Sequence, residues 1–459
     1  MSDWTLCIDF GTAFSKAAVA PTGAWTHFDP ATIRPLMLSA EGQNTFLLDS
    51  AIFVDEDRVL FGCAALNEAD AQADAKRAAL RSFKTLLSVS DLERALNTNA
   101  PATIDPHRIF QMRDLIVLYL AYLLATIDRA LLADPVLAQG GVLRRRYAAP
   151  AWRSGDSAGM HNVVVRLFAE AEAFRASVGK RLLSPDGLSL RTISDALPKA
   201  MANAEALEMG LVFEATAAAA YTSAGLEGSG SHLIVVDMGA GTTDIAALAR
   251  IGARTLELPE ARVTLKQAGD FLDRVIANRV LESARWARRA DERAELWSVL
   301  MRQMADIKEA IMADGRATLR NQGRSIALSL RDVEKDEDFR EFQKSLQQAY
   351  DHALAIVRDD ARARGRSEVQ AIAVGGGAST PLIQDLIRRK MESTRPRVVP
   401  RPATPDWAHA REFRGNLAPV FPQLAIAIGG ALAPDSMLAA RGGITPPAND
   451  QSDIPVGRD

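Results

Sequence analysis

Three short segments of the chain combine residue types that suit the binding of a phosphorylated ligand. Residues 8–16 read Ile-Asp-Phe-Gly-Thr-Ala-Phe-Ser-Lys, residues 236–244 read Val-Asp-Met-Gly-Ala-Gly-Thr-Thr-Asp, and residues 374–381 read Val-Gly-Gly-Gly-Ala-Ser-Thr-Pro. Each pattern alone is common in tight turns. The prediction of a binding site therefore depends on all three occurring in this order, with lobe-sized gaps between them.

The chemistry of these segments follows from their residue types. An aspartate at the end of a strand, as expected for Asp9 and Asp237, fixes a carboxylate that can hold hydrated Mg²⁺ through water. The glycine that follows lets the backbone turn tightly and bring N–H groups close to phosphate oxygens, while threonine adds a hydroxyl donor. Two such turns that face each other could hold a triphosphate. The triple glycine leaves room for a nucleoside against the backbone.

The elements that must position these segments are visible as apolar and helical patterns. Paired strands are expected at residues 6–8 with 16–20 and at 233–236 with 245–249, and a further strand at 371–374. The two strand-turn-strand blocks form a weak internal repeat, which indicates two similar lobes that face each other. Helical spacing is expected over residues 64–96, 105–132, 271–313, 336–363 and 423–438.

Composition limits the class of protein. The 459 residues, of which 48% are apolar and 24% charged, are enough for two or more compact units. A formal net charge of -3 gives no argument for nucleic acid or an anionic membrane. Cys7 and Cys63 predict no disulfide framework, no signal peptide is recognised, and the apolar run 115–127 is too short to span a bilayer. We therefore expect a cytoplasmic protein with no nucleic-acid or membrane partner.

The three segments resemble the phosphate-one, phosphate-two and adenosine motifs of the actin/DnaK/sugar-kinase superfamily. Further pieces are similar to the ATPase domain of DnaK-type (heat shock protein 70) chaperones, so the resemblance covers roughly residues 4 to 435. These pieces are Phe61-Gly62, Arg-Ser-Phe-Lys-Thr-Leu-Leu at 81–87, Tyr-Ala-Ala-Pro-Ala-Trp at 147–152, Glu-Ala-Thr-Ala-Ala-Ala at 214–219 and Ala-Gly-Asp-Phe-Leu-Asp at 268–273.

The resemblance implies ATP or ADP with Mg²⁺ as cofactors, and a role for each matching residue. Lys84, Glu214 and Asp237 would be catalytic: Lys84 would reach the γ-phosphate, Glu214 would position water, and Asp237, with Asp9, would hold Mg²⁺ through water. Asp244 would belong to the second phosphate loop and order solvent. The nucleotide-binding residues would be Asp9, Gly11, Thr12, Gly239, Gly241, Thr242, Thr243, Lys308, Gly375, Gly376 and Gly377.

Other interpretations of two of these residues stay open. Lys84 lies in a helical stretch of mixed charge and could be an ordinary solvated lysine. Glu214 could be a charge at the N-terminus of a helix, where it would interact favourably with the helix dipole.

The chain also departs from the family pattern. Ala240 replaces a phosphate-loop glycine, which is tolerated if its φ is negative. Around Lys308, Ala305 and Met312 replace the family's Glu and Ser, and Ser379 stands near the adenine-stacking Arg. We expect weaker nucleotide affinity or looser base selectivity than in a DnaK-type chaperone. The stretch 153–205 is longer than in the family and predicts an insertion around residues 175–197.

The predicted fold is α/β: a two-lobed actin-like ATPase fold of ribonuclease H-like repeats with a nucleotide cleft between the lobes. Lobe I would take residues 1–225 with a closing helix at 421–438, lobe II would take 226–420, and 439–459 would be a disordered tail. Nothing after residue 438 resembles a β-sandwich substrate domain, so we expect a short form without peptide binding.

The leading functional hypothesis is a DnaK-like ATPase whose slow Mg²⁺-dependent hydrolysis drives lobe closure and controls an unknown protein partner, for example a co-chaperone or nucleotide-exchange factor. The alternatives are a nucleotide-binding scaffold without turnover and a filament-forming actin-like ATPase. A sugar kinase ranks behind these, since no defined motif supplies a sugar-binding catalytic base.

Overall fold

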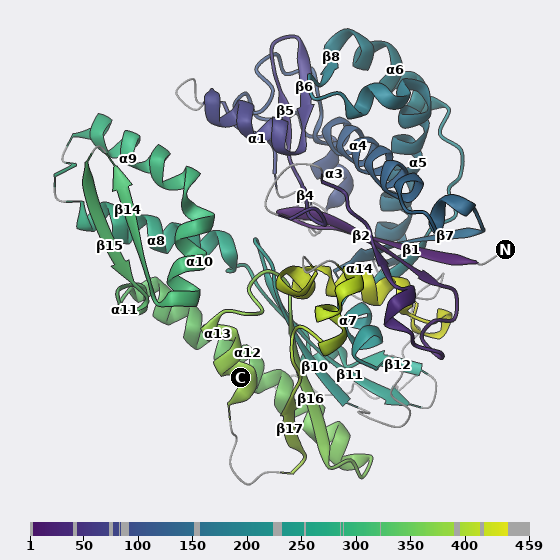
Figure 1. Ribbon diagram of the computed structural model, residues 1–459, viewed down its shortest axis with the longest axis vertical. Helices are drawn as coiled ribbons and strands as arrows, with labels where there is room; N and C mark the ends of the chain where they lie inside the picture. Colours follow the sequence, from purple (N-terminus) through teal and green to yellow (C-terminus); the bar gives the residue numbers. More distant parts are fainter. Residues whose placement is uncertain are drawn as a thin grey trace, which may run out of the picture.

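Two six-stranded sheets with the same strand order organise the chain (Figure 1). The structure is a computed structural model that describes residues 3–39, 44–72, 77–81, 83, 91–150, 157–223, 232–251, 254–284, 286–287, 289–321, 323–389, 395–413 and 417–438. We call the part built on the first sheet lobe I and the part built on the second sheet lobe II. The expected boundary at residue 225 and the tail 439–459 lie outside the described residues.

The first sheet has the order β3-β2-β1-β7-β9, with β4 also paired to β2. Its strands are β1 (Trp4–Phe10), β2 (Phe14–Pro21), β3 (Arg34–Pro35), β4 (Leu48–Asp49), β7 (Leu143–Ala149) and β9 (Gly210–Phe213). The second sheet has the order β12-β11-β10-β16-β17, with β13 also paired to β11. Its strands are β10 (His232–Met238), β11 (Thr243–Ile251), β12 (Arg254–Glu257), β13 (Val263–Leu265), β16 (Glu368–Val374) and β17 (Arg397–Pro400).

The matching orders confirm the internal repeat and the α/β fold class. In each sheet an antiparallel hairpin, β1–β2 or β10–β11, pairs through its first strand with a parallel strand, β7 or β16. The parallel strands then continue to β9 and β17. Because the carboxyl ends of parallel strands lie at one edge of a sheet, both lobes present equivalent edges for a ligand.

Each lobe has its own hydrophobic core. Lobe I contains α1 (Gly62–Ala71), α3 (Leu92–Leu96), α4 (Met112–Ala133), α5 (Ser157–Val178), α6 (Leu190–Ala202) and α7 (Glu214–Ser223). Lobe II contains α8 (Gly269–Ser283), α9 (Ala290–Arg302), α10 (Met304–Asp314), α11 (Leu330–Glu334), α12 (Glu337–Ala363), α13 (Pro381–Arg388) and the hairpin β14 (Arg316–Asn321) with β15 (Arg324–Ser329).

Three of the predicted helices are wrong in their extent, and one of them, the closing helix expected at 421–438, ends at Leu432. The stretch 64–96 is not one helix: α1 ends at Ala71, and Leu80 instead forms a β-bridge with Ile52. The helix expected from residue 105 begins only at Met112. The buried carboxylate of Asp105 accepts hydrogen bonds from backbone N–H groups further along the chain, which fixes a turn in place of a first helical turn.

Helix α4 extends beyond the apolar run 115–127 at both ends and is the one described helix long and apolar enough to cross a membrane by length and composition alone. Of the most apolar 18-residue window, 72% is buried inside the protein, against α5 and neighbouring elements of lobe I. The helix therefore serves as a core helix of this lobe.

The predicted insertion contains ordered structure. It comprises the end of α5, a 3-10 helix at Gly179–Leu183, the short strand β8 (Leu188–Ser189) and α6. Strand β8 pairs with β6 (Arg58–Phe61), which pairs with β5 (Ile52–Val54), so the insertion adds a third strand to a small sheet of lobe I. Because α6 packs on α5, the insertion joins this small sheet to the main body of the lobe.

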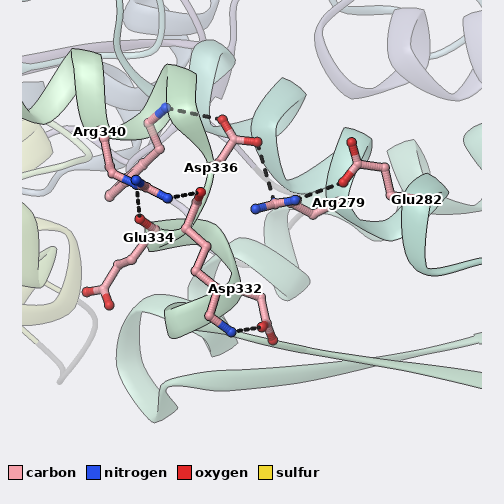
Figure 2. A network of polar contacts seen from close by, with 8 residues as sticks. Arg279, Glu282, Asp332, Glu334, Asp336 and Arg340 are labelled. Atoms are coloured by element: carbon pink, nitrogen blue, oxygen red, sulfur yellow. Dashed lines mark hydrogen bonds and ion pairs between the residues drawn. The ribbon is translucent and has the colours of Figure 1, made fainter.

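The outer part of lobe II is joined to α12 by a polar network, shown in Figure 2. Arg279 of α8 lies 2.8 Å from Glu282 and 3.5 Å from Asp336, which precedes α12. Arg340 donates to the backbone carbonyls of Glu334 and Lys335 at the end of α11. The network therefore links α8 and the end of α11 to the start of α12.

Helix α14 (Phe421–Leu432) packs between the lobes together with α7 (Figure 1). The two helices approach so closely that a Cβ on Gly429 would lie 1.8 Å from the Ala217 carbonyl oxygen. A Cβ on Gly430 would lie 2.3 Å from the Sγ atom of Cys7 in β1. The glycine pair therefore allows α14 to contact α7 and the lobe I sheet at once.

Gly429→Ala tests this close approach. We expect the substitution to destabilise the protein by about 3 kcal/mol or more, since the added methyl group forces the helices apart. The measurement is the urea midpoint of unfolding. The matched control is Gly159→Ala in α5, where a Cβ meets nothing within 4 Å and alanine should be neutral or stabilising by up to about 1 kcal/mol. Equal midpoints for the two variants would contradict the packing described here.

Candidate functional site

The carboxyl ends of β1, β7 and β9 place Asp9 and Glu214 at one edge of the lobe I sheet. These strands are parallel, with Asp9 opposite Ala148 and Ala149 opposite Phe213, the residue before Glu214. Both acidic residues are buried, at 3% and 5% exposure. Burial of two carboxylates is costly unless they are paired or serve a ligand, so their convergence marks this edge as a candidate site.

The buried thiol of Cys7 lies in the electrostatic field of both carboxylates. Burial raises the pKa of Cys7 far above its usual range, and the negative charges of Asp9 and Glu214 add to that rise, while Arg146 acts in the opposite direction. The thiol is therefore neutral at physiological pH and is a packing group.

Lys16 is a site residue to which the sequence analysis assigned no role. Its Nζ atom lies 2.8 Å from Oδ2 of Asp9, and both side chains are largely buried. Oδ1 of Asp9 has no hydrogen-bond partner among the described residues, so it is open to a further donor. The signal was present in the hairpin register, which pairs Asp9 with Lys16 directly across β1 and β2.

Gly11 allows the first turn to form. A Cβ at this position would lie 2.2 Å from the carbonyl oxygen of Phe14 and 2.8 Å from Nζ of Lys16. Thr12, beside it, is half-buried, and its phosphate-binding role stays a prediction. The turn thus brings a carboxylate, a cation and closely spaced backbone together.

In lobe II, Asp237 and the triple glycine occupy the equivalent edge. Asp237 lies next to the end of β10, opposite Val374 at the end of the parallel strand β16. Gly375 has φ +84°, and a Cβ there would lie 2.4 Å from Oδ1 of Asp237. A Cβ on Gly377 would likewise lie 2.5 Å from the side chain of Met238. Gly376, between them, is exposed. The structure therefore brings the second and third segments together, as the sequence analysis predicted.

The second turn is held by hydrogen bonds from its own threonines. Gly239 N–H donates to the Thr242 carbonyl, so Gly239, Ala240, Gly241 and Thr242 form the connection between β10 and β11. The hydroxyl of Thr242 donates to Asp244 (2.8 Å), and that of Thr243 donates to the Gln267 carbonyl (2.8 Å). With both hydroxyls bonded to protein acceptors, this turn offers a phosphate chiefly its backbone N–H groups.

Ala240 fits this turn without strain. Arg108 is the one non-glycine residue with positive φ in the described part of the chain. The φ of Ala240 is therefore not positive, as an alanine at this position requires. Its carbonyl accepts a 2.8 Å hydrogen bond from the N–H of Asp270, and the Gly239 carbonyl accepts one from Gly269. The N-terminus of α8 thus packs directly against the turn.

Lys308 of α10 does not stand free for a ligand. Its Nζ atom lies 2.8 Å from Oδ1 of Asp273 on α8.

Partial desolvation raises the pKa of the neighbouring Asp270, and the negative charge of Asp273 raises it further. The positive charges of Lys308 and Arg81 oppose the rise. Arg81 belongs to lobe I, so charged groups of the two lobes act on each other near the start of α8. A role of Lys308 in nucleotide binding stays a prediction.

The predicted catalytic residue Lys84 lies outside the described residues, as does Trp152. The residue before Lys84, Phe83, is 1% exposed and stacks on Tyr119 with ring centroids 4.8 Å apart. Phe83 also contacts Phe10 of β1, 5.7 Å away. The chain immediately before Lys84 is therefore anchored beneath the first turn.

The side chains present fit a magnesium ion held through water. Among the residues that the structure describes, no group of three or more His, Cys, Asp or Glu side chains could hold a metal directly. Asp9 and Asp237 supply one carboxylate from each lobe, and Mg²⁺ usually keeps several of its waters. Water-mediated binding by these two residues is consistent with this geometry.

Gly375→Ala tests whether the third segment must touch Asp237. Gly315→Ala is the matched control, because Gly315 also has positive φ (+73°) but a Cβ there meets nothing within 4 Å. Both variants carry backbone strain of roughly 1–2 kcal/mol. Gly375→Ala should lose about 1–3 kcal/mol more by overpacking against Asp237 and the backbone carbonyl of Met238. The readout is the urea midpoint of unfolding, and identical losses would show that Asp237 is not in contact.

Two comparisons with known proteins agree with this geometry. Residues 198–399, which include Glu214 and the second and third segments, match the family model described as Hsp70 protein. A stretch of 52 residues is 48% identical to "Actin-like protein MamK" of Magnetospirillum gryphiswaldense (strain DSM 6361 / JCM 21280 / NBRC 15271 / MSR-1), and it spans 11% of this chain and 13% of that protein. Both matches are to proteins of the actin/Hsp70 ATPase superfamily, and the two sheets of matching strand order agree with a two-lobed actin-like ATPase fold.

Proposed function

We propose that the protein binds ATP with Mg²⁺ between its two lobes and hydrolyses it slowly. The observation that carries this proposal is the equivalent placement of Asp9 and Asp237, each at the carboxyl end of the first strand of a hairpin in one of two matching sheets. Two carboxylates at equivalent strand ends of separate lobes would suit a hydrated metal on a triphosphate. When bound, Mg²⁺ would neutralise charge on the phosphate oxygens.

The chain's own residues then have distinct tasks. Asp9 and Asp237 orient metal-bound water. Glu214, buried near Asp9, orients the water that attacks the terminal phosphate. Lys16 and Lys84 offset negative charge, and the backbone N–H groups of both turns bind phosphate oxygens. This division fits phosphoryl transfer, in which enzymes contribute mostly positioning and charge stabilisation.

The cellular role would be that of a nucleotide-controlled switch. Lobe closure around ATP would be read by a protein partner, for example a co-chaperone or nucleotide-exchange factor. Two observations favour alternatives. The pairing of Lys308 with Asp273, in a motif that lacks the family's Glu and Ser, favours a scaffold that binds nucleotide with little turnover. The similarity to an actin-like protein favours filament formation.

Mg²⁺-dependent ATP binding and single-turnover hydrolysis test the proposal. We expect Lys84→Ala to lower single-turnover hydrolysis by about 10²–10³-fold, as loss of one charge-stabilising donor usually does. Asp9→Asn and Asp237→Asn should weaken binding only when Mg²⁺ is present. Asp186→Asn, at an exposed site in the insertion, serves as the control. Light scattering with ATP as protein concentration rises reports filaments.

The outcomes separate the candidate functions. Slow turnover that Lys84→Ala abolishes supports the switch, and binding without turnover favours the scaffold. Scattering that increases with both ATP and protein concentration favours the filament. Failure of the unmodified protein to bind ATP would refute the proposed function.

A further inference from the structure

The short strand β13 holds the side of the second turn. It pairs antiparallel with the start of β11, which places Thr264 opposite Asp244. The Thr264 hydroxyl donates to Oδ1 of Asp244 at 2.6 Å, and the Thr242 hydroxyl donates to Oδ2 at 2.8 Å. An ionised carboxylate only accepts hydrogen bonds, so both threonines act as donors. Asp244 therefore links an exposed strand residue to a residue of the turn.

The residues that follow β13, up to the first turn of α8, also hydrogen-bond to the second turn. The N–H groups of Gly269 and Asp270 donate to the carbonyls of Gly239 and Ala240, and the Thr243 hydroxyl donates to the Gln267 carbonyl. These bonds occupy carbonyl oxygens and side chains of the turn. A turn whose acceptors are satisfied on its protein side is fixed in a shape that presents N–H groups on the other side.

Thr264 can influence a ligand without touching it. It lies on β13 outside the turn, is exposed, and hydrogen-bonds to Asp244. The Asp244 carboxylate in turn holds the hydroxyl of Thr242. Loss of the Thr264 donor would leave Asp244 free to rotate and would release Thr242, so the turn would have to be ordered when the ligand binds. That ordering cost lowers affinity.

We propose that Thr264 is a positioning residue that acts through Asp244 to preorganise the second turn for a phosphate chain. The proposal rests on the proposed nucleotide-binding function and adds a residue outside the three recognised segments. It also gives Asp244 a role in fixing the turn, in addition to the solvent-ordering role that the resemblance implies.

Thr264→Val tests the proposal, because valine keeps the shape of threonine and removes the hydroxyl donor. We expect the Kd for Mg²⁺-ATP to rise about tenfold, in line with one hydrogen bond to a charged group, with little change in Tm. Thr264→Ser, which restores the donor, should recover most of the affinity. Thr318→Val is the matched control, since Thr318 is likewise an exposed threonine on a strand of lobe II.

Amide hydrogen exchange of residues 239–243, measured without nucleotide, gives a second readout. Thr264→Val should speed exchange there, while Thr318→Val should not. Wild-type affinity or unchanged exchange in Thr264→Val would overturn the positioning role. If the unmodified protein binds no ATP while exchange responds as expected, the proposed function fails and Thr264 holds the turn for another reason. The two failures are therefore distinguishable.

Discussion

The backbone of α14 passes so close to α7 that residue 429 has no room for a side chain, and the site depends on the placement of this helix. Helix α14 also packs on β1 and β2 of lobe I. At its other end, the carbonyl of Pro422 accepts a 2.8 Å hydrogen bond from Gly375 of lobe II. A single helix therefore sets the position of the triple glycine relative to the first turn. Its near-complete burial follows, since both flanks are covered.

The duplicated sheets give the two edges the same backbone but different electrostatics. On the lobe I side, Asp9 is paired with Lys16, and the hairpin carries its own cation. On the lobe II side, Asp244 faces Asp237 across the hairpin, and Asp270 and Asp273 lie at the start of α8. In lobe I, Lys16 offsets the charge of Asp9 beside the first turn. In lobe II, anionic phosphates would depend on backbone N–H groups and bound cations, which agrees with threonine hydroxyls bonded to protein acceptors.

Sequence alone predicted the features that depend on local patterning. The strands that end at Asp9 and Asp237 were found because apolar runs that stop at an aspartate and a glycine mark buried strand ends. Features that depend on tertiary pairing were missed. Helix α4 begins later than predicted because the side chain of Asp105 holds a turn before it. Leu80 forms a β-bridge with Ile52 where a helix was predicted. The roles of Lys16 and Thr264 follow from strand register, which no local pattern specifies.

Aromatic contacts between the lobes bear on how the two edges could move. Arg250 lies over the ring of Trp25 at 4.7 Å, and Trp407 contacts Phe28. β2 and β11 both run away from the phosphate turns; Trp25 lies in the turn that follows β2, and Arg250 lies near the end of β11. The lobes are thus joined at the ends farthest from the turns, in addition to the contacts of α14 near the triple glycine. At about 3.3 Å per residue, β2 and β11 separate these contacts from the turns by the length of a whole strand, and each strand would act as a lever between them. If the lobes rotate on nucleotide binding, as we propose, a small movement at these contacts becomes a larger one at Asp9 and Asp237. The packed end would resist separation of the lobes.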